Sequence, residues 1–352
     1  MKKVAGVFLL AIISIFLSGC SLSNPVVPEN SNSISKASVI KTLDGGVSWE
    51  AKTKVDDKKT ISSVNALSMA IDPFDENIIY LGSEKNGIFI SRDGAETWAQ
   101  MNFPEKVYGL ALDPKTPDVI YASGVLNGRA KIYKKIEKEG EWKEIYTEPS
   151  DGTVISALVI DKRNPTVLYA GTSEGMIFKT TDAGASWHNL YKAETPVNSI
   201  AFDSSNSNVV YFGVFQRGFL RTKDAGKNFE NLSEKINTTM NGQSVFSVVA
   251  DPFLSGTVYI GLKNGLAKSR NYGDDWQAVN ILESSKKFPI RSLTINPRNS
   301  REIIYVSEKA IYKSVDEGRQ WSTFQLDANK DVSAVVYNIT NPSIIYAGLR
   351  NY

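Results

Sequence analysis

The sequence predicts an all-β fold, a seven-bladed β-propeller built from four-stranded antiparallel blades. Three observations predict it: a short motif that recurs about every 45 residues, a second repeat that alternates with it, and complementary half-repeats near the two ends of the sequence. Units of this length that contain several short strands and turns are typical of propeller blades. Each repeat occurs seven times, which gives the number of blades.

The first repeat, here called the aspartate motif, has a Ser or Thr, an Asp two residues later and an aromatic residue five residues after the Asp. Thr42-Leu-Asp44-Gly-Gly-Val-Ser-Trp49 is the first copy, and all six tryptophans of the chain close a copy. The Asp positions are Asp44, Asp93, Asp182, Asp224, Asn271 and Asp316, and the aromatic positions are Trp49, Trp98, Trp142, Trp187, Phe229, Trp276 and Trp321. The copy ending at Trp142 is degraded, since Glu137 replaces the Asp and Gly140 comes one residue late.

The second repeat, here called the aspartate–proline turn, places an Asp or Asn, often followed by Pro, between two β-rich runs. Asp72-Pro73 is the first example, and a tyrosine, Tyr80, lies in the run that follows it. The corresponding tyrosines are 41 to 48 residues apart: Tyr80, Tyr121, Tyr169, Tyr211, Tyr259, Tyr305 and Tyr346. Each unit therefore consists of two strands joined by this turn, then a third strand, the aspartate motif and a fourth strand.

The first and last units are complementary halves. Residues 37–44 align with residues 175–182, which form a third strand leading into the motif, whereas the last unit stops after its second strand. We therefore expect residues 37–52 to supply strands three and four of the last blade. This arrangement leaves no open sheet edge between the first and last blades.

The repeated residues are explained by turn chemistry. An Asp carboxylate can accept backbone N–H bonds within a turn, glycine can adopt positive φ, and a tryptophan anchors the short outer strand. Calcium binding is disfavoured, because each turn offers one carboxylate and this cation prefers six to eight oxygens. We expect structural roles for both repeats.

The first 36 residues resemble a lipoprotein leader and tether. Lys2-Lys3 precede an apolar run from Val4 to Leu17, followed by Leu17-Ser-Gly-Cys20, which is similar to a bacterial lipobox. We expect a signal peptide over residues 1–19, a lipid on Cys20 and a flexible Ser-, Asn- and Pro-rich tether over residues 20–36. The propeller then covers residues 37–352.

The aspartate motif resembles the Asp-box or BNR repeat of sialidases, sortilin-type receptors, xyloglucanases and photosystem II assembly-factor propellers. The resemblance covers the chain from about residue 37 onward. It implies a propeller in which the motif is a structural turn away from the active face, so it implies little about function. The aspartate–proline half is most similar to sortilin-type and xyloglucanase propellers, whereas the single ring and leader are more similar to the photosystem II assembly factor.

Composition excludes several classes of function. Without Lys2 and Lys3, basic and acidic side chains balance, which argues against nucleic acid as a partner. His188 is the one histidine and Cys20 the one cysteine, so neither a Ser-His-Asp triad nor a His- or Cys-rich metal site is expected. We expect no cofactor and no metal. A pair of carboxylates remains open, because pairing is spatial.

We therefore expect a non-enzymatic binding or assembly propeller. It would be a monomer, anchored by lipid on the non-cytoplasmic side of a bacterial membrane, with a protein segment or another envelope component as its partner. The alternative is a glycan-active or carbohydrate-binding propeller, and a spacer without a specific ligand is a third reading. Two facing carboxylates flanked by exposed aromatic residues would favour the alternative.

The binding surface is expected on the open face, which we define as the end of the propeller formed by the turns between strands two and three. The motif face, at the other end, carries the aspartate motifs and the aspartate–proline turns. Arg217 is the preferred single residue, because its guanidinium can make a forked contact to a carboxylate. A loop over residues 231–244 is expected to overhang the channel mouth. The candidate residues are Glu84, Lys85, Asn127, Arg129, Glu174, Phe215, Gln216, Arg217, Lys263, Glu308 and Arg350.

Overall fold

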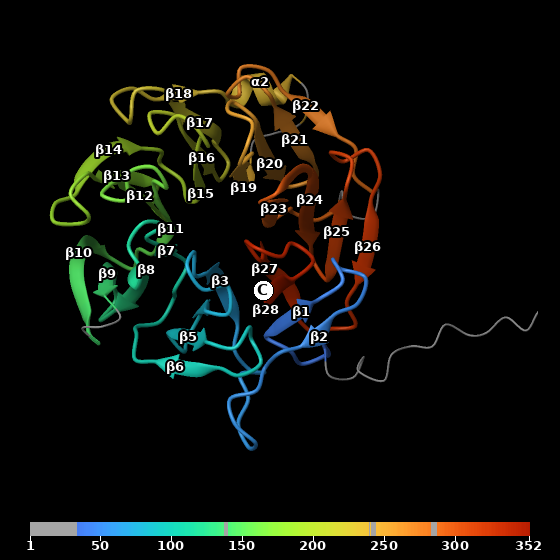
Figure 1. Cartoon of the computed structure of the whole chain (residues 1–352). Coiled ribbons are helices and arrows are strands. Elements are labelled where there is room, and N and C mark those ends of the chain that lie inside the picture. The colour runs from blue at the N-terminus through green and yellow to red at the C-terminus, as the bar shows by residue number, and fades with distance from the viewer. Residues whose placement is uncertain (1–33, 137–139, 239, 241–243, 283–286) are drawn as a thin grey trace, which may run out of the picture.

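The computed structural model describes residues 34–136, 140–238, 240, 244–282 and 287–352. The expected signal peptide, Cys20, most of the expected tether and Glu137 lie outside the described residues. Within them, 28 strands form seven four-stranded antiparallel sheets arranged in a ring (Figure 1). No helix in this part of the chain is long and apolar enough to cross a membrane.

Blades 1 to 3 follow one another along the chain, each beginning with its innermost strand. Blade 1 comprises β3 (Ala66–Ile71), β4 (Ile79–Ser83), β5 (Ile88–Ser91) and β6 (Ala99–Met101). Blade 2 comprises β7 (Leu110–Leu112), β8 (Val119–Leu126), β9 (Arg129–Ile136) and β10 (Trp142–Asp151). Blade 3 comprises β11 (Ile155–Ile160), β12 (Leu168–Thr172), β13 (Met176–Thr180) and β14 (His188–Lys192).

Blades 4 to 6 repeat this order. Blade 4 comprises β15 (Val197–Phe202), β16 (Val210–Val214), β17 (Gly218–Thr222) and β18 (Glu230–Asn231), followed by the short helix α2 (Ser233–Asn237). Blade 5 comprises β19 (Val245–Ala250), β20 (Val258–Leu262), β21 (Leu266–Ser269) and β22 (Gln277–Val279). Blade 6 comprises β23 (Ser292–Asn296), β24 (Asn299–Ser307), β25 (Ala310–Ser314) and β26 (Ser322–Gln325).

Blade 7 joins the two ends of the chain. Its inner strands are β27 (Asp331–Tyr337) and β28 (Ile345–Arg350), and its outer strands are β1 (Val39–Thr42) and β2 (Glu50–Ala51). Ile40 pairs with Ala347 and Thr42 with Ile345, so the blue N-terminal strands lie against the red C-terminal strands (Figure 1). The predicted seven-bladed fold, including closure of the ring by residues 37–52, is confirmed.

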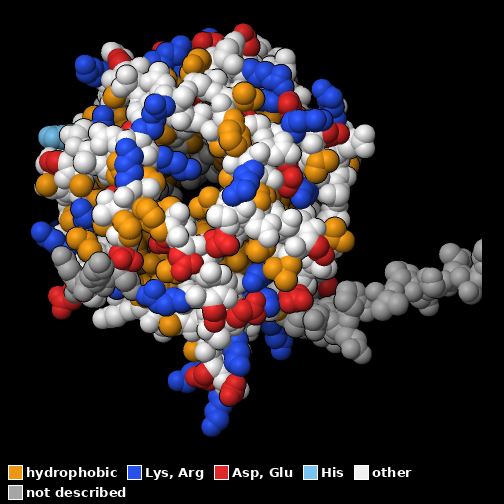
Figure 2. Space-filling model, in the orientation of Figure 1, with side chains coloured by type: hydrophobic (Ala, Val, Ile, Leu, Met, Phe, Trp, Pro, Cys, Tyr) orange, Lys and Arg blue, Asp and Glu red, His pale blue; other side chains and the backbone are white. Residues whose placement is uncertain are grey.

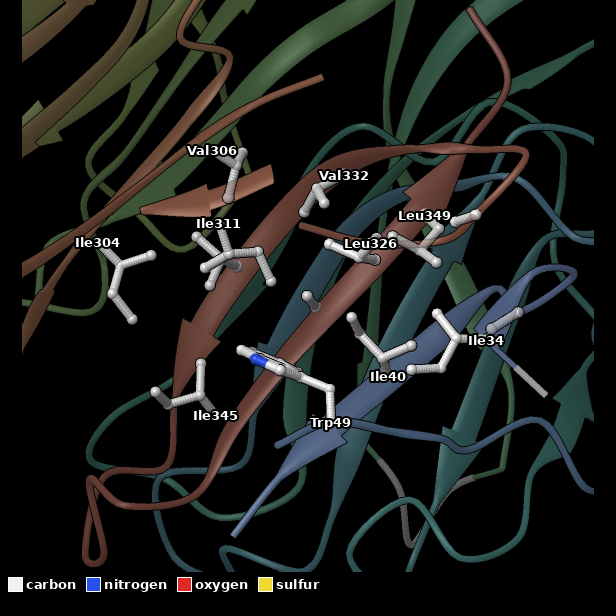
Figure 3. Packing of buried hydrophobic residues seen from close by; sticks show 14 of the residues in the cluster. Ile34, Ile40, Trp49, Ile304, Val306, Ile311, Leu326, Val332, Ile345 and Leu349 are labelled. Carbon is white, nitrogen blue, oxygen red and sulfur yellow. The ribbon is translucent and has the colours of Figure 1, made fainter. Parts of the chain in front are cut away.

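The core lies within and between the blades. All seven repeated tyrosines are at most 2% exposed, which explains why each second strand carries one. Where blade 6 meets blade 7, Trp49 packs among Ile40, Ile304 and Ile345 (Figure 3). An aromatic ring buried in this way is among the largest single hydrophobic contributions that a residue can make.

The aspartate motif is a turn stabilised from within, as blade 4 illustrates. Asp224 Oδ1 accepts hydrogen bonds from the Asn228 backbone N–H at 2.9 Å and from the Thr222 hydroxyl at 2.9 Å. Gly226 donates its N–H to Thr222 Oγ1 at 2.8 Å. The Asn228 bonds, the backbone one first and then the side-chain one, lower the pKa of Asp224 to about 2. The motif carboxylate is therefore used in turn formation.

A basic residue at the end of the third strand joins each of several blades to the next. It donates to the carbonyl oxygen of the residue after the motif Asp of the following blade, at 2.7 to 2.9 Å. The donor–acceptor pairs are Lys41–Gly94, Lys179–Ala225, Arg221–Tyr272 and Lys313–Gly45. Lys268 instead reaches the Glu317 carboxylate in the next motif, at 2.9 Å. The motif is thus an acceptor between blades as well as a turn.

Blade 1 departs from this pattern, because Ile90 occupies the position of the basic residue. The next blade, blade 2, carries the degraded copy of the motif. At the junction of blades 1 and 2, the donor position and the acceptor motif therefore both differ from the repeat.

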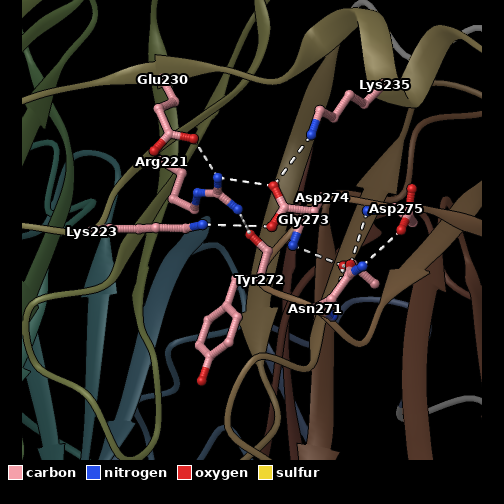
Figure 4. A network of polar contacts seen from close by, with 10 residues as sticks. Arg221, Lys223, Glu230, Lys235, Asn271, Tyr272, Gly273, Asp274 and Asp275 are labelled. Carbon is pink, nitrogen blue, oxygen red and sulfur yellow. Dashed lines mark hydrogen bonds and ion pairs between the residues drawn. The ribbon is translucent and has the colours of Figure 1, made fainter.

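Arg221 makes the most extensive of these contacts between blades (Figure 4). Its side chain is 1% exposed and contacts the Tyr272 carbonyl, the Glu230 carboxylate and, at 3.1 Å, the Asp274 carboxylate. The Asp274 carboxylate also forms ion pairs with the ammonium groups of Lys223 at 3.5 Å and Lys235 at 3.2 Å. Several acceptors compensate for the desolvation of this buried guanidinium, whereas a buried guanidinium without acceptors would destabilise the fold.

Candidate binding face around the channel mouth

The two ends of the propeller carry different chemistry. In six blades the residue after the motif Asp or Asn donates its N–H to a carbonyl near the end of the aspartate–proline turn of its own blade. These pairs are Gly45–Ser343, Gly94–Asn77, Ala183–Thr166, Ala225–Asn208, Tyr272–Gly256 and Glu317–Arg301. Both sets of turns therefore lie on the motif face, and the candidate binding residues lie on the open face.

The open-face residues named from the sequence fall into two groups. Three are half-buried: Glu84 after β4, Phe215 after β16 and Arg350 at the end of β28. The other eight are exposed: Lys85, Asn127, Arg129, Glu174, Gln216, Arg217, Lys263 and Glu308. They are spread around the ring, and the structure brings a smaller set together.

Two of the candidate arginines are already paired. Arg217 contacts the Glu194 carboxylate at 2.7 Å, and Arg129 contacts Asp151 at 2.8 Å. All four side chains are about half or more exposed, so these pairs contribute little to stability. Each pair does use one guanidinium nitrogen, Arg129 Nε or Arg217 Nη2, so a carboxylate from a partner would have to compete with it for that nitrogen.

The segment expected to overhang the channel mouth is placed differently. Residues 233–237 form α2, which packs against β17 with Ile236 fully buried between blades 4 and 5. Figure 1 shows α2 at the outer rim, beside β18 and β22. Ile236 explains the difference, because an apolar residue followed by a tight turn finds a buried site against the blade. Residues 239 and 241–243 of this segment lie outside the described residues.

A central hollow runs into the ring, with hydrophobic and basic side chains near its rim (Figure 2). At its open-face end, aromatic rings and guanidinium groups from four blades form a continuous chain. The ring of Phe215 lies 5.8 Å from that of Phe246, and the Arg291 guanidinium lies 5.3 Å from Phe246 and 4.3 Å from Tyr352. Arg350 lies over Tyr352 as well, at 4.3 Å. Blades 4, 5, 6 and 7 thus converge here.

A pocket of about 220 Å³ lies next to this chain of residues, between blades 6 and 7. Its walls include the aromatic rings of Phe288 and Tyr352 and two carboxylates, Glu308 and Asp331. Partial desolvation and then the charge of Asp331 raise the pKa of Glu308 above its usual value. The pocket thus brings two carboxylates and two aromatic residues together, which is one feature expected of a glycan site.

Sequence reasoning missed Phe246, Arg291, Tyr352, Asp331 and Phe288. Their residue types do not recur from blade to blade, so the repeats do not single them out. Phe246 and Arg291 each directly follow the repeated apolar residue at the start of a unit, Val245 and Ile290, and this shared position could have suggested that they lie at the same level of the ring. In the described part of the chain, no three His, Cys, Asp or Glu side chains are grouped to hold a metal ion.

No family model matches the chain. In sequence it is similar to a xyloglucanase of Acetivibrio thermocellus, with 28% identity in an alignment of 138 positions that covers 32% of this chain and 16% of that protein. It is also similar to an oligoxyloglucan-reducing end-specific xyloglucanase of Emericella nidulans, with 27% identity over 24% of this chain and 11% of that protein. The chain thus matches only a small part of each curated relative.

Solved structures share the propeller architecture. A GH74 xyloglucanase from Xanthomonas campestris matches with a TM-score of 0.69 and 14% identity, over 82% of this chain and 51% of that chain. YCF48 bound to D1 peptide matches with a TM-score of 0.60 and 14% identity, over 82% of this chain and 94% of that chain. At these identities the likeness establishes the fold, a single-ring, seven-bladed β-propeller similar to GH74 xyloglucanases and YCF48.

Proposed function

We propose that this chain is a lipid-anchored binding or assembly propeller of the bacterial cell envelope that holds a segment of a protein partner on its open face. The observation that carries the proposal is the convergence of Phe215, Phe246, Arg291, Tyr352 and Arg350 from four blades at one end of the channel. Aromatic and arginine side chains are the residues most enriched in protein-binding hot spots. The YCF48 propeller bound to D1 peptide supports the same reading.

The test is partner capture from intact envelopes after crosslinking, with the partner identified by mass spectrometry. Alanine replaces Phe246, Arg291 and Arg350 in one variant. A matched variant replaces Lys227, Arg298 and Arg319, which are exposed basic residues on the motif face. We expect the first variant to lose the partner and the second to retain it. Equal loss from both variants, or loss from the second alone, would place the site elsewhere.

The anchoring part of the proposal rests on Cys20 in Leu17-Ser-Gly-Cys20. Replacing Cys20 with Ala should abolish incorporation of radiolabelled fatty acid and release the propeller from the membrane fraction. A Ser21→Ala variant is the control and should keep both. Unchanged labelling of Cys20→Ala would refute lipidation at this residue without touching the proposal about the open face.

A second candidate function is a glycan-active or carbohydrate-binding propeller. It is favoured by the pocket that brings Glu308 and Asp331 together beside Phe288 and Tyr352, and by the sequence similarity to xyloglucanases. Carboxylate pairs perform acid–base or nucleophilic work in most glycoside hydrolases. Incubation with xyloglucan and analysis of released reducing ends tests it: activity that Glu308→Gln and Asp331→Asn both abolish would establish it, and no release would exclude xyloglucan hydrolysis.

A further inference from the structure

The basic residues of the open face differ in what surrounds their charge. Arg129 and Arg217 each contact a carboxylate, at 2.8 and 2.7 Å. For Arg291 and Arg350, the described part of the chain supplies aromatic rings instead. A guanidinium that is stacked on a ring is held in place through its planar face, and its N–H edge remains available for hydrogen bonding.

The stacking fixes both guanidinium groups relative to one ring. Arg291 and Arg350 each lie 4.3 Å from the centre of the Tyr352 ring, and Arg291 is also 5.3 Å from Phe246. Such pre-organisation lowers the conformational entropy that a long side chain loses on binding. Holding two positive charges near one another is unfavourable. The attraction of both guanidinium groups to the Tyr352 ring and the exposure of Arg291 to water offset this repulsion.

Arg350 carries a second sign of an unfilled site. Its Nε atom is buried and finds no acceptor among the described residues. Its partner across the sheet is Asp331, yet the two side chains do not form an ion pair within the described residues. A buried donor without an acceptor is unfavourable, so an acceptor brought by a ligand would gain more here than at a solvated arginine.

We propose that Arg291 and Arg350 form a carboxylate-binding site for a peptide segment that also carries an aromatic side chain. The inference rests on the proposed function and names the chemistry of the partner. The guanidinium N–H edges hold the carboxylate through forked hydrogen bonds, and the partner's ring packs against the half-buried Phe215–Phe246 pair.

The geometry of the hydrogen bonds, rather than the net charge of the open face, would select this ligand. Asp331 and Glu308 lie in the same pocket as Arg291 and Tyr352, so the local charge is close to balanced. A carboxylate that misses the two guanidinium edges is repelled by these acids, which favours one position of the segment. Specificity then depends on the forked geometry that arginine has and lysine lacks.

The experiment uses the full chain, purified in detergent and labelled with nitrogen-15 at arginine, so that each Nε–H signal is observed by NMR. The probes are N-acetylphenylalanine, which joins a ring to a carboxylate, its primary amide, which lacks the charge, and a xyloglucan heptasaccharide. We expect N-acetylphenylalanine to shift the Arg291 and Arg350 signals at millimolar concentration, with the amide binding at least about tenfold more weakly.

Arginine-to-lysine variants keep the positive charge and remove the forked guanidinium group. Arg291→Lys and Arg350→Lys should each weaken binding of N-acetylphenylalanine by about tenfold or more, whereas Arg129→Lys and Arg217→Lys should change it less than about twofold. Tyr352→Phe keeps the ring and should bind as the parent does.

Equal binding of the acid and its amide, equal loss from both pairs of arginine variants, or absence of any shift would overturn the carboxylate site. Shifts caused by the heptasaccharide but not by N-acetylphenylalanine would overturn it in favour of a glycan. If Arg291→Lys and Arg350→Lys still captured the envelope partner normally, this inference would fail while the proposed function stood. If the unmodified protein captured no partner at all, the proposed function would be refuted instead.

Discussion

Lys313 Nζ donates a hydrogen bond of 2.8 Å to the carbonyl oxygen of Gly45, although the two residues are 268 positions apart in the chain. Lys313 belongs to the third strand of blade 6, and Gly45 to the motif that the N-terminal segment supplies to blade 7. The same ammonium lies 2.7 Å from the Glu302 carboxylate. One side chain therefore joins the motif turn, a neighbouring acid and the seam at which the ring closes.

Replacing Lys313 with Met should destabilise the propeller. The change removes the ammonium donor from the Gly45 carbonyl and from the Glu302 carboxylate, which is 13% exposed and keeps the Tyr337 hydroxyl as a donor. We expect a loss of about 2 kcal/mol in the free energy of unfolding, measured by urea denaturation. Lys85→Met, at an exposed position, is the control and should be neutral. A midpoint for Lys313→Met equal to that of the control would show that the seam does not depend on this contact.

Arg221 allows a graded version of the same test. Lysine occupies this position in blades 3, 5, 6 and 7, so Arg221→Lys should keep the bond to the Tyr272 carbonyl and lose the second branch of the fork. We expect a cost of about 1 kcal/mol for Arg221→Lys and about 3 kcal/mol for Arg221→Met. The second cost stays moderate because Glu230 and Asp274 are 46% and 38% exposed and can be hydrated. Equal effects of the two variants would contradict this account.

Closure by β1 and β2 predicts that residues 37–52 are required for the fold. Deleting them removes Trp49, which is 4% exposed, and leaves β28 with an unpaired edge. We expect aggregation or loss of cooperative unfolding by circular dichroism. Trp49→Ala should fold but lose about 3 kcal/mol. A deletion variant that melts within about 2 °C of the parent would show that the ring closes in another way.

Acid should weaken the aspartate motifs. Hydrogen bonds lower the pKa values of Asp182, Asp224 and Asp316, so their contribution is complete above the unfolded-state pKa of about 3.9 and is lost as the pH falls through the folded-state values. We expect stability to fall steeply between pH of about 4 and 2. Asp224→Asn should reduce that slope and still fold at neutral pH.

Blade 5 shows why Asp224→Asn should fold. There Asn271 already occupies the Asp position, and its Oδ1 accepts from the Asp275 N–H at 2.9 Å. Asp327→Asn, at an exposed position outside the motifs, is the control. A slope in Asp224→Asn as steep as in the parent would mean that other groups govern acid unfolding.

The fold could be predicted because its determinants recur. The repeated tyrosines, beginning with Tyr80, mark the second strand of each blade, and the motif tryptophans mark the turn before the fourth strand. Each copy of the repeat therefore supports the same assignment of strands and turns. The complementary halves of the first and last units defined the closure between β1 and β28.

The candidate site could be predicted only in part, because its residues do not repeat. Phe215 and Arg350 were named from the turns between strands two and three, and they belong to the cluster at the channel mouth. Arg217 was preferred because its guanidinium can make a forked contact to a carboxylate, but Glu194, from the connection that precedes the first strand of the same blade, already contacts its Nη2 atom. Pairing between unrepeated side chains depends on the curvature of the ring, which sequence spacing does not encode.

The pairing of β1 with β28 also orders events in time. The strands that leave the ribosome first must wait for the last ones, because Val39 through Thr42 find their partners only at residues 345–348. Until then Ile40 and Trp49 remain accessible to water, chaperones and proteases. A chain that stalls before residue 345 lacks β28 and cannot bury these two side chains as the finished ring does, so it keeps an apolar surface that favours aggregation.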